Sequence, residues 1–396
     1  MYFETHDLSV GYGGRPLIEK INLSIEKGRI LTLIGPNGSI EGGRIIGLLG
    51  PNGSGKSTIL KTITKHLEKI AGVVTIENDN ISKWSNKELA KRLSVMLTER
   101  IDPELMTCEQ VVAMGRYPYT NHFGSLTPGD RQVVEESLHM RAEELAERPF
   151  TDISDGQRQR IMLARAICQQ PEIIMLDEPT SYLDIRHKIE LLDILRKMAR
   201  EKNAAVVMSL HEIDLAAKIS DQIICVKGDR IRLFGTPEQV FTGERVKELY
   251  ELESGSFNTL FGSVELMAPE GEPEIFVLAG AGKGIPIYRL LQKSKRAFST
   301  GVLFENDVDL QVASALAAHV TVAPAFGTFG ERELNEAKRW IDRARCVVDA
   351  GTPVGEQNRR SRELIQYART EGKRVITGAE AFENIDAVPN GIQKEN

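Results

Sequence analysis

Residues 50–58 of the 396-residue sequence read GPNGSGKST, which fits the phosphate-binding pattern of glycine, any four residues, glycine, lysine and serine or threonine. The apolar run 45–49 precedes this stretch, and residues 59–67 with helical apolar spacing follow it, so we expect a buried strand, a turn and a helix. Glycine permits the positive φ angles that turn successive N–H groups toward one anion at a helix N-terminus. A purely structural turn is the alternative, and the complete pattern in this context disfavours it.

Each residue of this loop is expected to help hold ATP with Mg²⁺. Lys56 reaches the β- and γ-phosphates, and the Ser57 hydroxyl can bind the ion. The candidate ATP-binding residues of the loop are Gly50, Pro51, Asn52, Gly53, Ser54, Gly55, Lys56, Ser57 and Thr58. Tyr12 lies in the turn between the expected strands 2–10 and 18–25, where its ring either packs on a purine or is an ordinary turn residue.

A direct repeat surrounds the start of the loop. Residues 25–39 (IEKGRILTLIGPNGS) and 40–54 (IEGGRIIGLLGPNGS) agree at 11 of 15 positions. The first copy runs into Ile40 and Glu41, where a working loop has glycine, lysine and serine, so only the second copy is complete. One sheet position cannot hold both copies, and we therefore expect residues 30–34 at a sheet edge or on the surface.

Two adjacent acids, Asp177 and Glu178, end the apolar run 173–176, which is typical of a fully buried parallel strand. Such a pair needs positive charge nearby, and a Mg²⁺-nucleotide supplies it. Asp177 can hold the ion through water, and Glu178 can orient and polarise a nucleophilic water. His211 follows a second buried strand at 204–209. A lone histidine there is more often structural, but the order of the motifs favours a catalytic role.

Length and charge limit the class of protein. A chain of 396 residues predicts two or three domains, and a net charge of −6 gives no reason to expect a nucleic-acid partner. The four cysteines form no C-x-x-C or Cys/His cluster and indicate buried thiols in a reducing compartment. We expect no secretory signal at the start MYFETHDLSV and no membrane-spanning helix, so any membrane role requires a partner.

Taken in order, these motifs resemble the nucleotide-binding domain of ATP-binding-cassette (ABC) proteins. Residues 153–157, ISDGQ, are similar to the family signature LSGGQ. The resemblance implies an α/β fold for residues 1–254, with a P-loop NTPase core that is RecA-like and a helical subdomain. It implies that Tyr12 stacks on adenine, that Glu178 and His211 are catalytic, and that Ser57 and Asp177 bind the metal. It also implies that the signature residues, which are Ser154, Asp155, Gly156 and Gln157, contact the ATP of a partner cassette. Asp184 would belong to the D-loop.

Within the family, residues 111–120 (VVAMGRYPYT) resemble importers of iron-siderophore, haem and cobalamin chelates. This resemblance implies a head-to-tail homodimer, transmembrane permease subunits, an indirect link to a substrate-binding protein, and a peripheral place on the cytoplasmic face of the membrane. Two alternatives stay open: a soluble cassette protein without a membrane partner, and an ATP-binding regulatory module with impaired hydrolysis.

The sequence departs from the family pattern where a glutamine normally touches the metal and the attacking water. Thr98 and Glu99 occupy this Q-loop position. Thr98 is shorter and would act through a water molecule, while Glu99 would add negative charge near Glu178. Slow or differently coupled turnover is expected. Asp155, where the signature usually has glycine, is a milder departure, and the family offers no function for the repeat.

Beyond the first domain, residues 255–273 are interpreted as a linker with one short strand at 263–266. From residue 274 onward, strands alternate with helices, which predicts a parallel Rossmann-like α/β domain at 274–396. Its first turn, GAGKG, lies at the carboxyl end of a strand, where such sheets bind ligands. The candidate site comprises Gly280, Gly282, Gly284, Glu305 and Asp349. The G-x-G-x-G spacing departs from the dinucleotide fingerprint, so a dinucleotide, another small ligand, and a structural or dimerising role all stay open.

Overall fold

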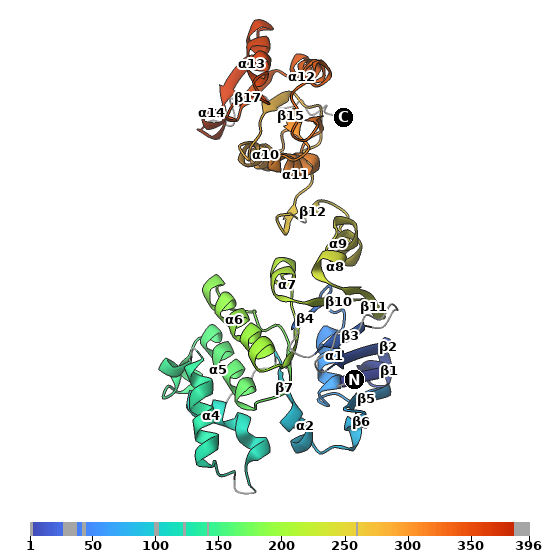
Figure 1. Ribbon diagram of the computed structural model, residues 1–396, viewed down its shortest axis with the longest axis vertical. Coiled ribbons are helices and arrows are strands. Elements are labelled where there is room, and N and C mark those ends of the chain that lie inside the picture. Colours follow the sequence, from blue (N-terminus) through green and yellow to red (C-terminus); the bar gives the residue numbers. More distant parts are fainter. Residues whose placement is uncertain are drawn as a thin grey trace. The chain divides into compact units, whose positions relative to one another are not determined.

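The computed structural model describes residues 3–26, 38–41, 45–98, 103–121, 124–140, 142–258 and 260–383. They belong to two compact units, Met1–Tyr250 and Glu251–Asn396 (Figure 1). Within the described ranges, the structure contains no helix that is both long and apolar enough to span a membrane.

The central sheet of the first unit has six strands among the described residues. In spatial order they are β11 (Arg230–Gly235), β10 (Gln222–Lys227), β4 (Ile45–Leu49), β9 (Ala205–Ser209), β8 (Ile173–Leu176) and β7 (Leu93–Met96). β11 runs antiparallel to β10 in a hairpin, and the other neighbours are parallel. Every residue of β4 and β8 is buried, as their continuous apolar runs predict. The segments that follow β4, β9, β8 and β7 therefore meet at one edge of the sheet.

The sheet distinguishes the two copies of the repeat. The second copy supplies β4, between β10 and β9, and leads into α1 (Lys56–Ile63), as predicted. α1 buries Ile59, Leu60 and Ile63 in the core, and each such side chain contributes about 1.5–3 kcal/mol of hydrophobic stabilisation. The junction of the two copies forms the edge strand β3 (Gly38–Glu41) of another sheet. Residues 30–34 lie outside the described residues.

That other sheet has the strand order β3-β2-β1-β5-β6. β1 (Phe3–Tyr12) and β2 (Arg15–Glu26) form the predicted antiparallel pair, but the turn between them is only Gly13 and Gly14, both with positive φ. β5 (Ala71–Ile76) and β6 (Asp79–Asn80) complete the sheet. Tyr12 is thus the last residue of β1, directly before the turn.

A helical subdomain lies between β7 and β8 in the chain. Its helices are α3 (Cys108–Ala113), η2 (Met114–Tyr119), η3 (Glu143–Leu145), η4 (Phe150–Asp152), α4 (Pro128–His139) and α5 (Asp155–Cys168). Residues 108–119 are thus helical, although the sequence there contains Gly115 and Pro118. α3 begins with a capping box, in which the side chains of Thr107 and Gln110 accept from each other's backbone N–H groups. This short-range signal favours a helix start at this point.

The remaining elements of the first unit connect these layers. They are η1 (Ile81–Lys83), α2 (Asn86–Arg92), α6 (Ile185–Glu201), α7 (Ile213–Ile219), α8 (Pro237–Val240) and α9 (Gly243–Tyr250). Figure 1 shows α5 and α6 on the side of the first unit where β7 lies. α6 is capped by Asp184, whose carboxylate accepts from the His187 N–H at 2.9 Å.

The second unit contains a five-stranded sheet in the order β16-β15-β14-β17-β18, and each neighbouring pair is parallel. The alternation of strands and helices is confirmed, and the order 3-2-1-4-5 is that of doubly wound sheets. The elements are β14 (Ile275–Leu278), α10 (Gly284–Lys293), β15 (Phe298–Phe304), α11 (Val308–Leu316), β16 (His319–Ala323), α12 (Glu331–Arg343), β17 (Cys346–Asp349), α13 (Ser361–Thr370), β18 (Arg374–Thr377) and α14 (Gly378–Glu383). Ile275 and Val277 pack toward α10 and α11, whereas Phe276 and Leu278 pack toward α12 and α13.

The expected linker is more ordered than predicted. The predicted strand is present as β13 (Ser263–Glu265), and it pairs with β12 (Ser256–Asn258), which the sequence reading missed. A three-residue strand is too short to give a periodic pattern. Both strands belong to the second unit, where Glu265 forms an ion pair with Arg289.

Candidate nucleotide site

The glycine loop after β4 has the conformation that an anion site requires. Gly50, Gly53 and Gly55 have φ angles of 155°, 77° and 91°, and a Cβ on Gly50 would lie 2.2 Å from the Val226 carbonyl oxygen. Only glycine fits there. Within the described part of the chain, no protein group accepts from the N–H groups of Gly53, Gly55, Lys56 and Ser57. These donors are available at the positive end of α1.

Lys56 lies within this loop and is almost fully buried. Its Nζ donates to the carbonyl oxygens of Gly50 at 2.8 Å and Pro51 at 3.1 Å. Burial lowers the pKa of the ammonium group, and the carboxylates of Glu178 and Asp177 oppose that shift. The loop thus holds its cation beside free N–H donors, which is the electrostatic setting for a polyphosphate.

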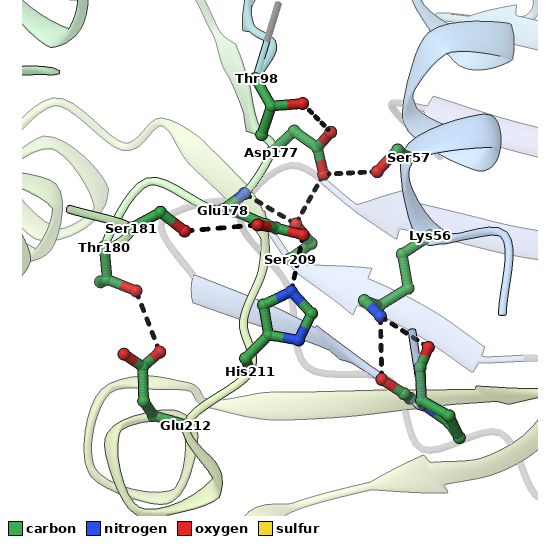
Figure 2. A network of polar contacts seen from close by, with 12 residues as sticks. Lys56, Ser57, Thr98, Asp177, Glu178, Thr180, Ser181, Ser209, His211 and Glu212 are labelled. Carbon is green, nitrogen blue, oxygen red and sulfur yellow. Dashed lines mark hydrogen bonds and ion pairs between the residues drawn. The ribbon is translucent and has the colours of Figure 1, made fainter. Parts of the chain in front are cut away.

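Asp177 is 1% exposed and gathers hydroxyl groups from three elements. Ser57 Oγ and Ser209 Oγ donate to its Oδ1 at 3.0 and 2.7 Å, and Thr98 Oγ1 donates to its Oδ2 at 3.3 Å (Figure 2). An oxygen set of one carboxylate and adjacent hydroxyls suits Mg²⁺, which binds few protein ligands and takes substrate phosphates for the rest. Ser57 and Asp177, the predicted metal residues, are therefore adjacent and fit that ion.

Glu178 points its carboxylate at His211. The distance from Glu178 Oε1 to His211 Nε2 is 2.6 Å, and Ser181 Oγ donates to the other oxygen at 3.3 Å (Figure 2). Because a carboxylate only accepts, Nε2 carries the proton in this contact. Glu178 has a φ of 50°, a left-handed conformation that non-glycine residues rarely adopt, and it marks the sharp turn after β8. The predicted catalytic pair is thus brought together from the ends of β8 and β9.

The Q-loop position is only partly described. Thr98 contacts Asp177 directly, and its action on a metal or attacking water through an intervening water stays a prediction. Glu99 lies outside the described residues. Tyr12 is 56% exposed, and its hydroxyl lies 3.3 Å from Thr58 Oγ1 at the first turn of α1. The ring is thus exposed beside the loop, and its stacking on adenine stays a prediction.

The signature residues form a separate group at the exposed start of α5. Ser154 and Gln157 cap each other, with Ser154 Oγ accepting from the Gln157 N–H at 3.3 Å and Gln157 Oε1 accepting from the Ser154 N–H at 3.0 Å. A Cβ on Gly156 would lie 3.5 Å from Leu183 Cδ2, which is ordinary contact. Asp155 is exposed in the first helical turn, where its charge favours the helix dipole. Ser154 and Asp155 are exposed, and Asp155 lines a pocket that Thr98 and Glu178 also line.

Two polar residues near the acids were missed by sequence reasoning. Ser209 bonds to both Asp177 and Glu178, and Glu212, directly after His211, accepts from Thr180 Oγ1 at 3.1 Å (Figure 2). Glu212 also accepts from Lys188 Nζ at 2.6 Å. The signal for Ser209 was a hydroxyl at the carboxyl end of an otherwise apolar buried strand. Buried polar groups need partners, so its position next to an acidic strand end was informative.

The glycine turn of the second unit differs in what surrounds it. The N–H of Ala281 donates to Asp307 Oδ2 at 2.9 Å, and the N–H groups of Gly284 and Ile285 donate to Asp309 at 3.0 Å each. Asp309 is fully buried, and burial raises the pKa of its carboxyl group. Two carboxylates of the chain itself thus accept from the N–H groups of the turn that the sequence marked as a candidate ligand site.

The other members of that predicted site do not converge on the turn. Glu305 accepts from the Ala325 N–H at 3.2 Å, and Asp349 accepts from the Gly351 N–H at 2.9 Å, so each supports its own loop. Glycine at position 284 is explained by packing, because a Cβ would lie 2.5 Å from the Tyr288 ring. Asp307 and Asp309 were missed, although an acid at a helix N-cap was a readable signal.

Comparison with known proteins gives independent results for the two units. A family model described as ABC transporter matches residues 39–181, and one described as MJ0874 family matches residues 298–394. The ABC transporter ATP-binding protein MJ0873 of Methanocaldococcus jannaschii is 44% identical over 294 residues, which cover 74% of this chain and 96% of the relative. One chain of a solved ABC transporter in an inward-facing conformation superposes with a TM-score of 0.52 and 26% identity, covering 63% of this chain and 89% of that chain.

Two further relatives are named for what they import. The iron(3+)-hydroxamate import ATP-binding protein FhuC of Bacillus subtilis is 36% identical over 251 residues, covering 63% of this chain and 88% of the relative. The cobalamin import ATP-binding protein BtuD of Halobacterium salinarum is 30% identical over 333 residues, covering 82% of this chain and 79% of the relative. The second alignment is longer than the first unit of this chain, so the similarity extends into the second unit.

Proposed function

The chain belongs to the ABC transporter ATPase family, and on that premise we propose that it is the ATP-hydrolysing subunit of an importer of iron-siderophore, haem or cobalamin-type chelates. Relatives named for iron(3+)-hydroxamate and cobalamin import support the substrate class. The observation that carries the chemistry is the meeting of a free N–H loop, a buried lysine and the Glu178–His211 pair at one sheet edge.

In this proposal, the loop after β4 binds the polyphosphate of ATP. The N–H groups of Gly53, Gly55, Lys56 and Ser57 donate to phosphate oxygens. Lys56 Nζ exchanges its two carbonyl contacts for the β- and γ-phosphates. Tyr12 covers the adenine from the end of β1. Because these donors are in place before the nucleotide arrives, little reorganisation accompanies binding.

Ser57 and Asp177 are the residues that would hold Mg²⁺, which neutralises the charge that develops on the phosphate oxygens when it is bound. Thr98 and Ser209 supply hydroxyls that keep the Asp177 carboxylate oriented. Replacement of the usual glutamine by Thr98 leaves this carboxylate contact but removes an amide that would reach the water. Hydrolysis slower than in cassettes with glutamine is therefore expected.

Glu178 is proposed as the group that orients and polarises the attacking water. His211, already at 2.6 Å, holds the carboxylate in place and can turn toward the γ-phosphate once the nucleotide binds. Loss of a positioned general base costs about 10²–10⁴ in rate, so Glu178 is the residue with the largest expected effect.

A homodimer arranged head to tail is proposed because the signature residues form an exposed group of their own at the start of α5. In such a dimer, this group from one copy faces the loop of the other. Asp155 would then bring a negative charge near the partner's triphosphate, which weakens closure relative to a glycine at that position.

Attachment to permease subunits at the cytoplasmic face of the membrane is proposed for the helical subdomain. Leu105, Met114 and Tyr117 are 97%, 45% and 66% exposed, within or beside α3 and η2. Large apolar side chains exposed together mark an interaction surface. A substrate-binding protein would be linked only through the permease.

The test is phosphate release measured with the permease present. A tagged chain is purified from detergent-solubilised membranes, and co-purification of an integral membrane protein is expected. Addition of an iron(III)-hydroxamate or a cobalamin to the reconstituted complex should raise ATP hydrolysis, and Glu178→Gln should abolish it. A chain that hydrolyses ATP but copurifies with no membrane protein would support the rival reading as a soluble cassette protein.

For the second unit, we propose a structural or dimerising role. The carboxylates of Asp307 and Asp309 on its glycine turn disfavour an anionic ligand there. Removal of residues 251–396 should therefore lower the dimer fraction measured by analytical ultracentrifugation. A melting temperature raised by nucleotides or dinucleotides would instead support ligand sensing.

A further inference from the structure

Ser209 joins the two acids of the proposed hydrolysis site through one hydroxyl group. It is the last residue of β9, adjacent to β8, and is fully buried. Its Oγ donates to Asp177 Oδ1 at 2.7 Å and accepts from the Glu178 N–H at 2.8 Å (Figure 2). None of the motifs read from the sequence includes this residue.

The direction of both hydrogen bonds is fixed by chemistry. A backbone N–H only donates, so the Glu178 N–H must point at a lone pair of Ser209 Oγ. The single hydroxyl proton is then free to point only at Asp177, whose carboxylate accepts. A charge-assisted hydrogen bond of this kind is stronger than a neutral one, particularly where water is excluded.

The second contact lies at a strained point of the chain. Glu178 has a φ of 50°, and this turn directs its carboxylate to His211 at 2.6 Å. Backbone in such a conformation persists when surrounding contacts hold it. Asp177 is also held from β7, because its own N–H donates to the Met96 carbonyl oxygen at 2.8 Å. The N–H of Glu178 donates instead to Ser209 Oγ.

We propose that Ser209 is a positioning residue for ATP hydrolysis, which fixes the metal-binding carboxylate of Asp177 relative to the water-polarising carboxylate of Glu178. It touches neither the nucleotide nor the water. This inference rests on the roles proposed for the two acids. Its consequence is that loss of the hydroxyl slows turnover and weakens use of Mg²⁺, while ATP affinity, which depends on the loop and Lys56, is preserved.

The chain offers a matched control in Ser94. This residue lies in β7 of the same sheet and is 1% exposed, and its hydroxyl has no hydrogen-bond partner in the described structure. Ser94→Ala therefore removes a buried hydroxyl at equal burial without touching either acid. It should hydrolyse ATP at the wild-type rate.

The experiment measures steady-state ATP hydrolysis by the full-length chain over a range of ATP and Mg²⁺ concentrations. Ser209→Ala should lower kcat about tenfold to a hundredfold, with KM for ATP changed less than about threefold, as expected for an interaction that acts on turnover. The Mg²⁺ concentration that gives half-maximal activity should rise severalfold. Thermal unfolding measured on each variant records whether the fold is retained.

A second pair of variants separates the hydroxyl from packing. Ser209→Thr and Ser209→Val have nearly equal side-chain volumes and differ in the hydroxyl. Ser209→Thr should be at least about tenfold more active than Ser209→Val. Equal rates for Ser209→Thr and Ser209→Val, or for Ser209→Ala and Ser94→Ala, would overturn the positioning role and leave the proposed function intact. A wild-type chain without ATPase activity would overturn the proposed function as well.

Discussion

Two glycine-rich turns in this chain, one in each unit, share nearly the same backbone shape. Gly50 and Gly280 have φ angles of 155° and 156°, and Gly53 and Gly282 have φ angles of 77° and 78°. Each turn follows a buried parallel strand and leads into a helix. They differ in their acceptors. In the first turn the N–H groups of Gly53, Gly55, Lys56 and Ser57 have no protein acceptor among the described residues, and in the second turn two aspartates accept from the N–H groups.

The comparison shows that backbone shape alone does not make an anion site. Both turns present N–H groups at the positive end of a helix. The first adds a buried cation, Lys56, and keeps its acids at the ends of other strands, where Ser57 and Asp177 would hold a metal ion. In the second turn, Asp307 and Asp309 accept directly from the N–H groups. Their carboxylates therefore already offset the positive potential of those N–H groups.

The prediction with the largest expected effect tests whether ATP hydrolysis depends on the residues around the first turn. Glu178→Gln should preserve ATP binding and lower hydrolysis by about two orders of magnitude or more, because a general base is lost. Glu305→Gln, at the corresponding edge of the second sheet, is the matched control and should leave hydrolysis unchanged. Phosphate release by the full-length chain is the measurement. Normal hydrolysis by Glu178→Gln together with inactivity of His211→Ala would reverse the assigned roles.

The second prediction uses the lysine that each turn contains. In a Glu178→Gln background, which prevents turnover, Lys56→Ala should weaken ATP binding about 10- to 100-fold, the range expected for a charge-assisted hydrogen bond worth about 1.5–3 kcal/mol. Lys283, exposed in the second turn, should tolerate alanine without any change in ATP affinity. Isothermal titration calorimetry checks both. An equal loss from the two substitutions would mean that both turns bind nucleotide.

The first turn could be predicted from sequence because its determinants are local. The spacing of glycines, Lys56 and Ser57 specifies both the loop and its ligand, and the apolar run before Asp177 specifies the neighbouring buried strand. The use of the second copy as β4 also follows locally, since only the second copy continues into lysine and serine. Motif order was therefore sufficient for the site, apart from contacts made between strands.

The second turn could not be predicted in the same way, because its acceptors come from another loop. Asp307 and Asp309 follow β15, and they reach the turn only because β14 and β15 are neighbours and α10 and α11 pack together. Ser209 was missed for the same reason, since its role depends on β9 lying beside β8. The sequence predicted strands and turns well, but not which polar side chains meet across them.

The third prediction removes an acceptor from the second turn. Asp309→Ala leaves the N–H groups of Gly284 and Ile285 without their acceptor, at a cost of about 2 kcal/mol in the free energy of unfolding of the second unit. Urea unfolding is followed by tryptophan fluorescence in a chain that carries Trp84→Phe, which leaves Trp340, in α12, as the only tryptophan. Glu305→Ala, at an exposed acid on the same edge, should change this free energy by less than about 0.5 kcal/mol.

Stabilisation of the wild-type second unit by added phosphate or dinucleotide would contradict this interpretation, because the turn would then be open to anions. Asp309→Ala provides the sharper form of the same test. With the carboxylate gone, the two turns become more alike, and phosphate should stabilise the variant more than the wild type.

The smallest effect is a pH dependence that distinguishes Asp309 from most acids of the chain. Burial raises the pKa of Asp309 in the folded state above the ordinary aspartate value. Between these two pKa values, the folded state holds a proton that the unfolded chain has released. The stability that Asp309 contributes is complete below the ordinary value and is lost as the pH rises through the raised value. Glu363 and Glu380 have lowered pKa values and act in the opposite sense, so wild type must be compared with Asp309→Asn. Urea unfolding monitored by Trp340 gives the free energy of unfolding of the wild type and of Asp309→Asn. The wild-type value minus the Asp309→Asn value should fall as the pH rises across this window. A difference that rises instead would show that the N–H donors of Gly284 and Ile285 stabilise the Asp309 carboxylate more than burial destabilises it.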